Sequence, residues 1–148
     1  MTIFFDLDGC LADLYAMPNW LALLRAYDPT PYAEAGVMHN MSLLARYLNK
    51  LRAAGYKIGV ISWLSKEPTP AYDAAVTAAK KEWLNRHLHS VSWDVIHIVA
   101  HGTPKESFIT SADDILFDDE ARNRENWTGR AYEPNQILEV LKGLLEGE

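Results

Sequence analysis

The stretch Phe4-Phe5-Asp6-Leu7-Asp8-Gly9-Cys10-Leu11-Ala12-Asp13 stands near the start of the 148-residue chain and holds its strongest signal. Residues 2–7 predict a short buried strand, because most of them are apolar. The strand gives way to two carboxylates, Asp6 and Asp8, and then to Gly9, which allows a tight turn. A single aspartate after a strand is usually a turn or helix-cap residue. Two of them call for an explanation from the rest of the chain.

Strands and helices alternate along the remaining sequence. Further runs of β-branched or apolar residues predict strands at residues 56–63, 95–99 and 115–117. Apolar residues at helical spacing, or a proline in the first turn, predict helices at residues 15–27, 41–54, 69–89 and 134–145. This alternation predicts an α/β fold, a three-layer α/β/α Rossmann-like parallel sheet with helices on both faces.

Polar residues gather where the predicted strands end. They are Asp6, Asp8, Ser62, Asp118 and Asp119. Because ligands bind at the carboxyl ends of the strands in such sheets, we expect these side chains to share one edge. Two acidic pairs packed together would raise each other's pKa and cost desolvation free energy. A hard cation with oxygen ligands removes that cost, so the sequence predicts a Mg²⁺ site.

The composition limits the classes of protein to which this chain can belong. With 49% hydrophobic and 23% charged residues, it has the make-up of a globular domain. The net charge of −6, without a basic run, argues against stable binding to long nucleic acids. One cysteine, Cys10, allows no internal disulfide and no Cys-rich metal site. Residues 3–5 are too short a run for a signal peptide or membrane span, so no membrane contact and a cytoplasmic location are expected.

Four segments, in order along most of the chain, resemble the haloacid-dehalogenase-like (HAD-like) phosphohydrolase superfamily. Asp6-Leu7-Asp8-Gly9-Cys10-Leu11 is similar to the DxDGxx loop of the family. Ser62 matches the polar residue at the end of the second strand, and Lys105 matches a lysine ahead of the fourth strand. The acidic pair Asp118-Asp119 completes the set. The resemblance implies Mg²⁺-dependent hydrolysis of a phosphomonoester through an aspartyl-phosphate intermediate.

The same resemblance implies a role for each residue in the DxDGxx loop. Asp6 would attack phosphorus and carry the phosphoryl group. Asp8 would protonate the leaving oxygen and then activate water. Gly9 would let the loop turn so that its amides face the phosphate.

Outside the loop, Ser62 would bind a phosphoryl oxygen, and Lys105 would supply positive charge beside it. The resemblance assigns Mg²⁺ to Asp6, the Asp8 backbone carbonyl and the Asp118-Asp119 pair, without settling which member of the pair is the direct ligand. Asn123 stands where many relatives have a carboxylate, and it would orient a metal-bound water. Three other lysines compete with Lys105: Lys66, and the pair Lys80 and Lys81, which is more simply a solvated helix face.

The substrate should depend on the segment between the first strand and the helix at residue 41. We expect residues 1–148 to form one domain, with a small helical cap insert at about 14–40 that leaves the site open. Asp6 to Asp13 is most similar to the 5′(3′)-deoxyribonucleotidase branch, which implies a nucleoside 5′-monophosphate as the small phosphorylated substrate. Four aromatic residues near the opening are suited to stacking on a base: Tyr15, Trp20, Tyr27 and Tyr32. The alternative is that Trp20 and Tyr27 only pack their helix onto the sheet.

Two alternatives stay open at this point. The first keeps the chemistry but acts on a macromolecular phosphoester, such as a phosphoprotein or a nucleic-acid end, which a small cap would admit. The second is a HAD-like binding module without turnover, although such a module has no need for a costly cluster of charges. The sequence leaves the oligomeric state unknown.

Overall fold

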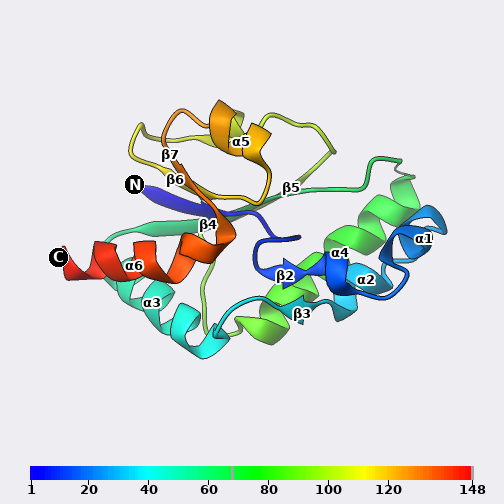
Figure 1. The fold of residues 1–148 in the computed structure, drawn as a ribbon, viewed down its shortest axis with the longest axis horizontal. Helices are drawn as coiled ribbons and strands as arrows, with labels where there is room; N and C mark the ends of the chain where they lie inside the picture. Colours follow the sequence, from blue (N-terminus) through cyan, green and yellow to red (C-terminus); the bar gives the residue numbers. More distant parts are fainter. Residues whose placement is uncertain (68, 148) are drawn as a thin grey trace.

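The computed structural model describes residues 1–67 and 69–147 and places a five-stranded parallel sheet at the centre of the molecule (Figure 1). Its order is β5-β4-β1-β6-β7. The strands are β1 (Thr2–Phe5), β4 (Lys57–Trp63), β5 (Val95–Val99), β6 (Ile115–Phe117) and β7 (Arg130–Tyr132). Because β1 pairs with β4 on one side and β6 on the other, the residues that follow β1 lie at the middle of the edge formed by the carboxyl ends of the strands.

Helices cover both faces of the sheet, which confirms the predicted α/β fold. One face packs against α3 (Met41–Ala53), α4 (Pro70–His87) and α6 (Ile137–Glu146). The other face packs near η2 (Lys105–Phe108) and α5 (Ala121–Asn126). Strand residues alternate between the two faces, as the pleat requires. Ile3 and Phe5 therefore join the first core, while Phe4 joins the second, against Trp127.

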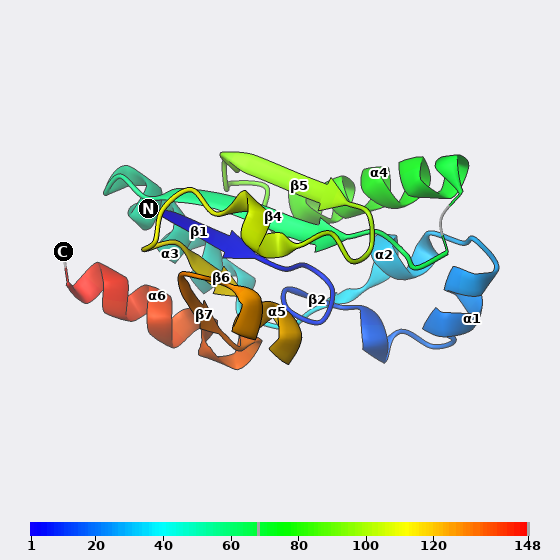
Figure 2. The ribbon, with the colours of Figure 1, turned by 90° about the horizontal axis from the view of Figure 1, so that it is seen from above.

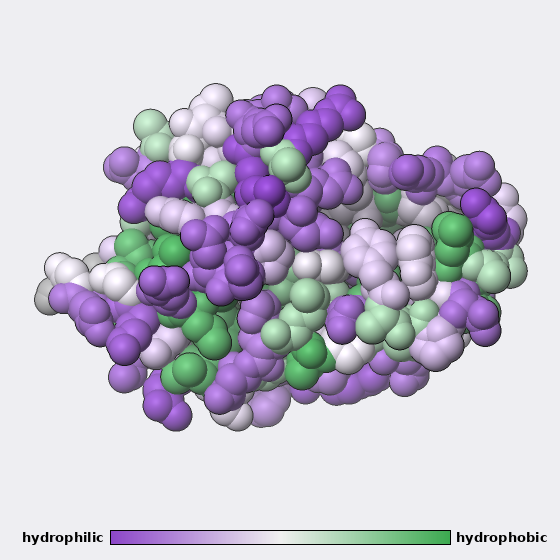
Figure 3. Space-filling model, in the orientation of Figure 1, coloured by the Kyte–Doolittle hydropathy of each residue, from purple (hydrophilic) through white to green (hydrophobic). Residues whose placement is uncertain are grey.

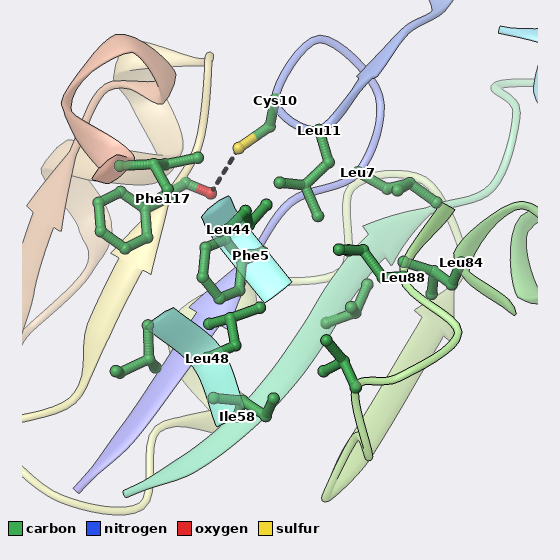
Figure 4. Close-up of a cluster of buried hydrophobic side chains, with 14 of the residues drawn as sticks. Phe5, Leu7, Cys10, Leu11, Leu44, Leu48, Ile58, Leu84, Leu88 and Phe117 are labelled. Atoms are coloured by element: carbon green, nitrogen blue, oxygen red, sulfur yellow. Dashed lines mark hydrogen bonds between the residues drawn. The ribbon is translucent and has the colours of Figure 1, made fainter. Parts of the chain in front are cut away.

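The larger core lies between the sheet and the three long helices, and Figure 4 shows part of it. The rings of Phe5 and Phe117 stack with their centroids 5.2 Å apart. Cys10 is fully buried beside them, and its thiol donates to the carbonyl oxygen of Phe117 at 3.5 Å. Burial, followed by the charge of Asp6, raises the pKa of Cys10 well above its ordinary value, so the thiol is neutral. Cys10 is thus a core residue.

An insert of short elements separates β1 from α3. It consists of β2 (Ala12–Asp13), η1 (Leu14–Ala16), α1 (Trp20–Arg25), α2 (Thr30–Glu34) and β3 (Gly36–Val37). Tyr32 and Leu14 pack with Tyr72 and Val76 of α4 in a small core of their own. The arrows of β1, β4 and β5 point toward the end of the molecule where this insert lies (Figure 2).

Helix α1 differs from the prediction of one continuous helix over residues 15–27, which was wrong. Pro18 has no backbone N–H to donate, and Asn19 adopts a left-handed conformation with φ of 58°, so the chain starts a new helix at Trp20. No residue of α1 is buried, and Leu21 is 42% exposed. Hydrophobic residues are correspondingly visible at the surface over α1 in Figure 3.

The other predicted elements match the structure, with small differences at their ends. The closing helix begins as a turn, η3 (Pro134–Gln136), before α6. The strand β7 and the helix α5 were not predicted, and neither was α2, which begins where a break was expected.

Within the described residues, no helix combines the length and the apolar character that a membrane crossing requires.

Candidate active site

The loop after β1 is closed on itself by backbone hydrogen bonds. The amides of Cys10, Leu11 and Ala12 all donate to the carbonyl oxygen of Leu7, at 3.2, 2.9 and 2.9 Å. The amide of Asp6 donates to the carbonyl oxygen of Phe117 at 2.9 Å, which continues the pairing of β1 with β6. The register therefore brings Asp6 beside the residues that follow Phe117.

Three carboxylates meet at this edge of the sheet, as the sequence predicted. Asp6, Asp118 and Asp119 each offer an oxygen, and these oxygens all lie within 4.8 Å of one another. Asp6 is 7% exposed and Asp118 is fully buried. Carboxylates that lie this close together and are shielded from water repel one another, so holding them together without a cation costs free energy. The group could hold a metal ion.

Lys105 supplies the positive charge that faces this group. Its ammonium lies 3.1 Å from Asp6 Oδ1 and 2.7 Å from Asp118 Oδ2, and its side chain is 2% exposed. Burial alone would lower the pKa of Lys105, but the charges of Asp6 and Asp118 outweigh it and raise that pKa. The ammonium also lies 5.3 Å from the ring centroid of Trp63. Two of its three N–H donors serve carboxylates, which leaves one for another acceptor.

Asp118 and Asp119 have different surroundings. Asp118 accepts from the Glu120 amide at 2.9 Å, from Lys105 Nζ and from Asn123 Nδ2 at 3.2 Å. Asn123 is itself 5% exposed, so its contact with Asp118 is a buried one. Asp119 is only partly buried, lines a cavity and has no cationic partner among the described residues. The oxygens of Asp119 are therefore the more available for a metal ion.

Gly9 lies directly against Asp119. It has φ of +75°, a conformation that residues with a side chain rarely adopt. A Cβ atom at this position would clash with the Asp119 carboxylate and approach the ring of Tyr15. Glycine is therefore required for the loop to approach Asp119. Contact of the Gly9 loop with a phosphate stays a prediction.

Asp8 has a partner that the sequence did not suggest. Lys80 Nζ lies 2.9 Å from Asp8 Oδ2, 2.7 Å from Ser62 Oγ and 2.6 Å from the carbonyl oxygen of Trp63. The expectation that Lys80 belongs to a solvated helix face was wrong, because its side chain is 1% exposed. Lys81 is exposed, as expected. Ser62 is fully buried and bonded to Lys80, and its role as a phosphate ligand stays a prediction.

A cavity of about 510 Å³ opens over the carboxylates. Its polar floor includes Asp6, Asp8, Lys105 and Asp119. The insert supplies much of its apolar wall, through Tyr15, Trp20, Leu21, Leu24 and Tyr27. Trp20 and Tyr27 thus face the cavity and belong to none of the buried clusters, against the alternative that they pack a helix onto the sheet.

Trp63 and His101, to which the sequence analysis gave no role, also line this cavity. Their ring centroids lie 4.8 Å apart, and Trp63 Nε1 donates to the carbonyl oxygen of Thr103 at 2.8 Å. Trp63 is the residue directly after Ser62, so its place at the end of β4 was available as a signal. The competitor Lys66 lines the cavity as an exposed residue.

Asp118 and Asp119 hold protons more tightly than an ordinary aspartate does. Burial, a hydrogen bond with Asp6 and the negative charges of Asp6 and Asp118 together raise the pKa of Asp119 to about 8. Burial and the charge of Asp6 also raise the pKa of Asp118, although Lys105 partly offsets this. A cation that displaced the Asp119 proton would relieve the repulsion among all three groups.

Because the pKa of Asp119 is raised, we expect the effect of Mg²⁺ on thermal stability to depend on pH. The folded protein holds the Asp119 proton more tightly than the unfolded chain, so metal-free stability should fall as the pH rises from about 4 to about 8. The resemblance assigns Mg²⁺ to the Asp118-Asp119 pair, and an ion bound through Asp119 would have to displace that proton. We therefore expect Mg²⁺ to raise the melting temperature more at about pH 9 than at about pH 6.

Differential scanning calorimetry with and without Mg²⁺ at both pH values measures this effect. Asp119→Asn is the matched variant, since it removes the proton and one metal ligand together. An equal Mg²⁺ effect at both pH values, or an undiminished effect in Asp119→Asn, would show that Asp119 is not the residue through which the metal acts.

Comparison with known proteins gives similarity at the level of solved structures alone. No protein-family model matches the sequence, and no curated protein matches it. A D,D-heptose 1,7-bisphosphate phosphatase from Burkholderia thailandensis is similar over 84% of this chain and 69% of that chain, with 20% identity and a TM-score of 0.48. The HAD domain of the effector protein Lem4 from Legionella pneumophila is similar over 98% of this chain and 93% of that chain, with 13% identity and a TM-score of 0.46. Similarity this weak says nothing about chemistry, so the residues of this chain carry the functional conclusion.

Proposed function

We propose that this chain is a Mg²⁺-dependent phosphomonoesterase of the HAD-like superfamily, with Asp6 as its nucleophile. The observation that carries the proposal is the buried group of Asp6, Asp118 and Asp119, with Lys105 bridging two of them beneath a cavity. A carboxylate can attack a phosphate dianion only where cations offset their repulsion. Lys105 supplies one positive charge, and the acidic group is suited to binding a second cation.

Mg²⁺ fits the donor set, because carboxylates are the hard oxygen ligands that it prefers. Asp6, Asp119 and the backbone carbonyl of Asp8 would hold it, with Asp118 and Asn123 beside them. When bound, Mg²⁺ would neutralise the negative charge on the phosphoryl oxygens. The charges are consistent with a divalent cation at this site. When ionised, the four aspartates carry a formal charge of −4, and the ammonium groups of Lys80 and Lys105 reduce it to −2: Asp6, Asp8, Asp118 and Asp119.

The residues divide the reaction into two displacements. In the first, an oxygen of Asp6 bonds to phosphorus while the bond from phosphorus to the ester oxygen breaks, and the carboxylic acid form of Asp8 gives its proton to that oxygen. In the second, the Asp8 carboxylate takes a proton from water as the water oxygen attacks phosphorus. Inorganic phosphate leaves and the Asp6 carboxylate is restored. The third N–H donor of Lys105, which lines the cavity, would bind a phosphoryl oxygen during both steps.

Nucleoside 5′-monophosphates are the substrate class that we propose. The aromatic rings of Trp20, Tyr15 and Trp63 line the cavity above the carboxylates, and such rings stack on nucleobases. The volume of about 510 Å³ also lies in the range of pockets for small ligands. Both features favour a small aromatic substrate over a macromolecular one.

A phosphatase screen with and without Mg²⁺ tests this function. We expect Mg²⁺-dependent release of phosphate from 4-nitrophenyl phosphate and from deoxynucleoside monophosphates, with a higher kcat/KM for nucleotides than for sugar phosphates. Because stacking contributes about 1–3 kcal/mol per base, Trp20→Ala should lower kcat/KM for nucleotides by about 5- to 150-fold. The same change should alter kcat/KM for glycerol phosphate by less than about twofold, because that substrate has no ring to stack.

Two results would count against the proposal in different ways. If no phosphomonoester turns over with Mg²⁺ present, the hydrolase function is wrong. If glycerol phosphate and nucleotides lose kcat/KM equally in Trp20→Ala, the hydrolase function stands but stacking on a base does not.

A further inference from the structure

Lys80 is a buried cation that the two displacements above do not use. It comes from α4, behind the site, and its ammonium is surrounded by acceptors from two other segments. Ser62 Oγ and the Trp63 carbonyl oxygen belong to β4, while Asp8 Oδ2 belongs to the loop after β1.

The ammonium of Lys80 has no donor left for a substrate. It carries three N–H groups, and three acceptors lie at 2.6, 2.7 and 2.9 Å. Lys80 is also not among the residues that line the cavity, whereas Asp8 is. Lys80 therefore contacts Asp8 from the side away from the cavity, and any influence on the reaction must pass through Asp8 or Ser62.

The carboxylate of Asp8 has a charged partner in Lys80. Its side chain is 14% exposed, and Lys80 is its one ion-pair partner within residues 1–67 and 69–147. The residue that follows Asp8 is Gly9, in a left-handed conformation, so the loop itself places no packed side chain against the carboxylate from that position. A charge-assisted hydrogen bond to a fixed ammonium is the interaction that selects one position for the carboxylate.

We propose that Lys80 is a positioning residue, anchored on β4 by Ser62 and Trp63, that holds the Asp8 carboxylate toward the cavity. This inference rests on the proposed function, because it assigns Asp8 the acid–base role. The contact also extends to the insert: Lys80 Nζ lies 5.0 Å from the ring centroid of Tyr32 in α2, which is itself 4% exposed. One side chain thus joins the acid–base residue to the sheet, to α4 and to the insert.

The test compares Lys80→Met with Lys81→Met on 4-nitrophenyl phosphate and Mg²⁺. Methionine keeps most of the volume of lysine but has no donor. We expect Lys80→Met to lower kcat by about 10²-fold while KM changes by less than about threefold, because a small misplacement of a catalytic group costs this much. Lys81→Met changes the exposed neighbour on the same helix and should leave both constants unaltered.

Asp8→Asn separates positioning from a general structural role. If Lys80 acts by positioning Asp8, adding Lys80→Met to Asp8→Asn should lower kcat by less than about threefold further, since the group to be positioned has already been lost. If Lys80→Met does not fold, Lys80→Arg replaces it, because a planar guanidinium keeps the charge but cannot reproduce three closely spaced bonds. We expect Lys80→Arg to lower kcat by about tenfold, with the same loss of effect in Asp8→Asn.

The outcomes distinguish this inference from the proposed function. A wild-type protein that is inactive with Mg²⁺ overturns both. An active wild type with Lys80→Met equal to Lys81→Met, or with losses that multiply in the double variant, overturns the role of Lys80 alone.

Discussion

Asp6→Asn is expected to abolish Mg²⁺-dependent turnover of 4-nitrophenyl phosphate, with kcat lowered by at least about 10³-fold, as when the nucleophile of a hydrolase is removed. The amide has nearly the same shape but is a poor nucleophile for phosphorus. It also removes one charge from the group that would hold the metal. Steady-state kinetics measures the loss.

The stability of Asp6→Asn separates lost chemistry from lost structure. In the metal-free state we expect it to unfold at the same temperature as the wild type or higher, because one of three repelling carboxylates is gone while Lys105 keeps Asp118. Asp113→Asn is the control, since Asp113 is exposed and precedes β6, at the opposite end of that strand from Asp118. An Asp6→Asn protein that is folded and keeps wild-type kcat would exclude Asp6 as the nucleophile.

Among the substitutions considered for this site, Lys105→Met is expected to lower the free energy of unfolding the most. The substitution leaves the carboxylates of Asp6 and Asp118 without their shared cation in a site where the lysine is 2% exposed. Breaking a buried ion pair by removing one partner costs about 3–5 kcal/mol. Chemical denaturation in the absence of Mg²⁺ should show a loss of this size in the free energy of unfolding, together with a loss of turnover.

Two further variants show whether the loss in the free energy of unfolding comes from the broken ion pairs. Lys50→Met, at an exposed position of α3, should change the free energy of unfolding by less than about 0.5 kcal/mol. Adding Asp118→Asn to Lys105→Met should recover part of the lost stability, because it removes an unpaired buried charge. If Lys105→Met is as stable as Lys50→Met, the ion pairs with Asp6 and Asp118 do not support the folded state.

The sheet and the acidic edge were predictable because short-range patterns determine them. Val95–Val99 and Ile115–Phe117 are strands at the predicted residues, since runs of β-branched and apolar residues with turn residues around them have few alternatives. Once the strands were parallel, Asp6 and Asp118 had to meet, because each follows its strand directly and the two strands pair.

The insert and the strand at the edge of the sheet were harder to predict. The helical pattern of apolar residues continues across Pro18 and so predicts one helix, whereas proline breaks the chain into two short elements. The strand Arg130–Tyr132 has three residues and a polar start, which is too little for a periodicity signal.

The surroundings of Lys80 were predicted wrongly. A lysine within a helix is usually exposed, and its neighbour Lys81 is. A signal was nevertheless present, because Val76, Lys80 and Trp83 lie three or four residues apart and so share one helix face, and all three are buried. The acceptors for the Lys80 ammonium come from β4 and from the loop after β1. Because these segments are distant in sequence, the residues around Lys80 do not indicate them.

The aspartyl phosphate itself is the most direct measurement of the central claim. Enzyme mixed with 4-nitrophenyl phosphate and Mg²⁺ is quenched in acid, and hydroxylamine then converts an acyl phosphate on a carboxylate into a hydroxamate that peptide mass spectrometry can place on one residue. The mechanism predicts a hydroxamate on Asp6, in a substrate-dependent amount, and none in Asp6→Asn. Turnover without any hydroxamate, or a hydroxamate on another residue in place of Asp6, would contradict it.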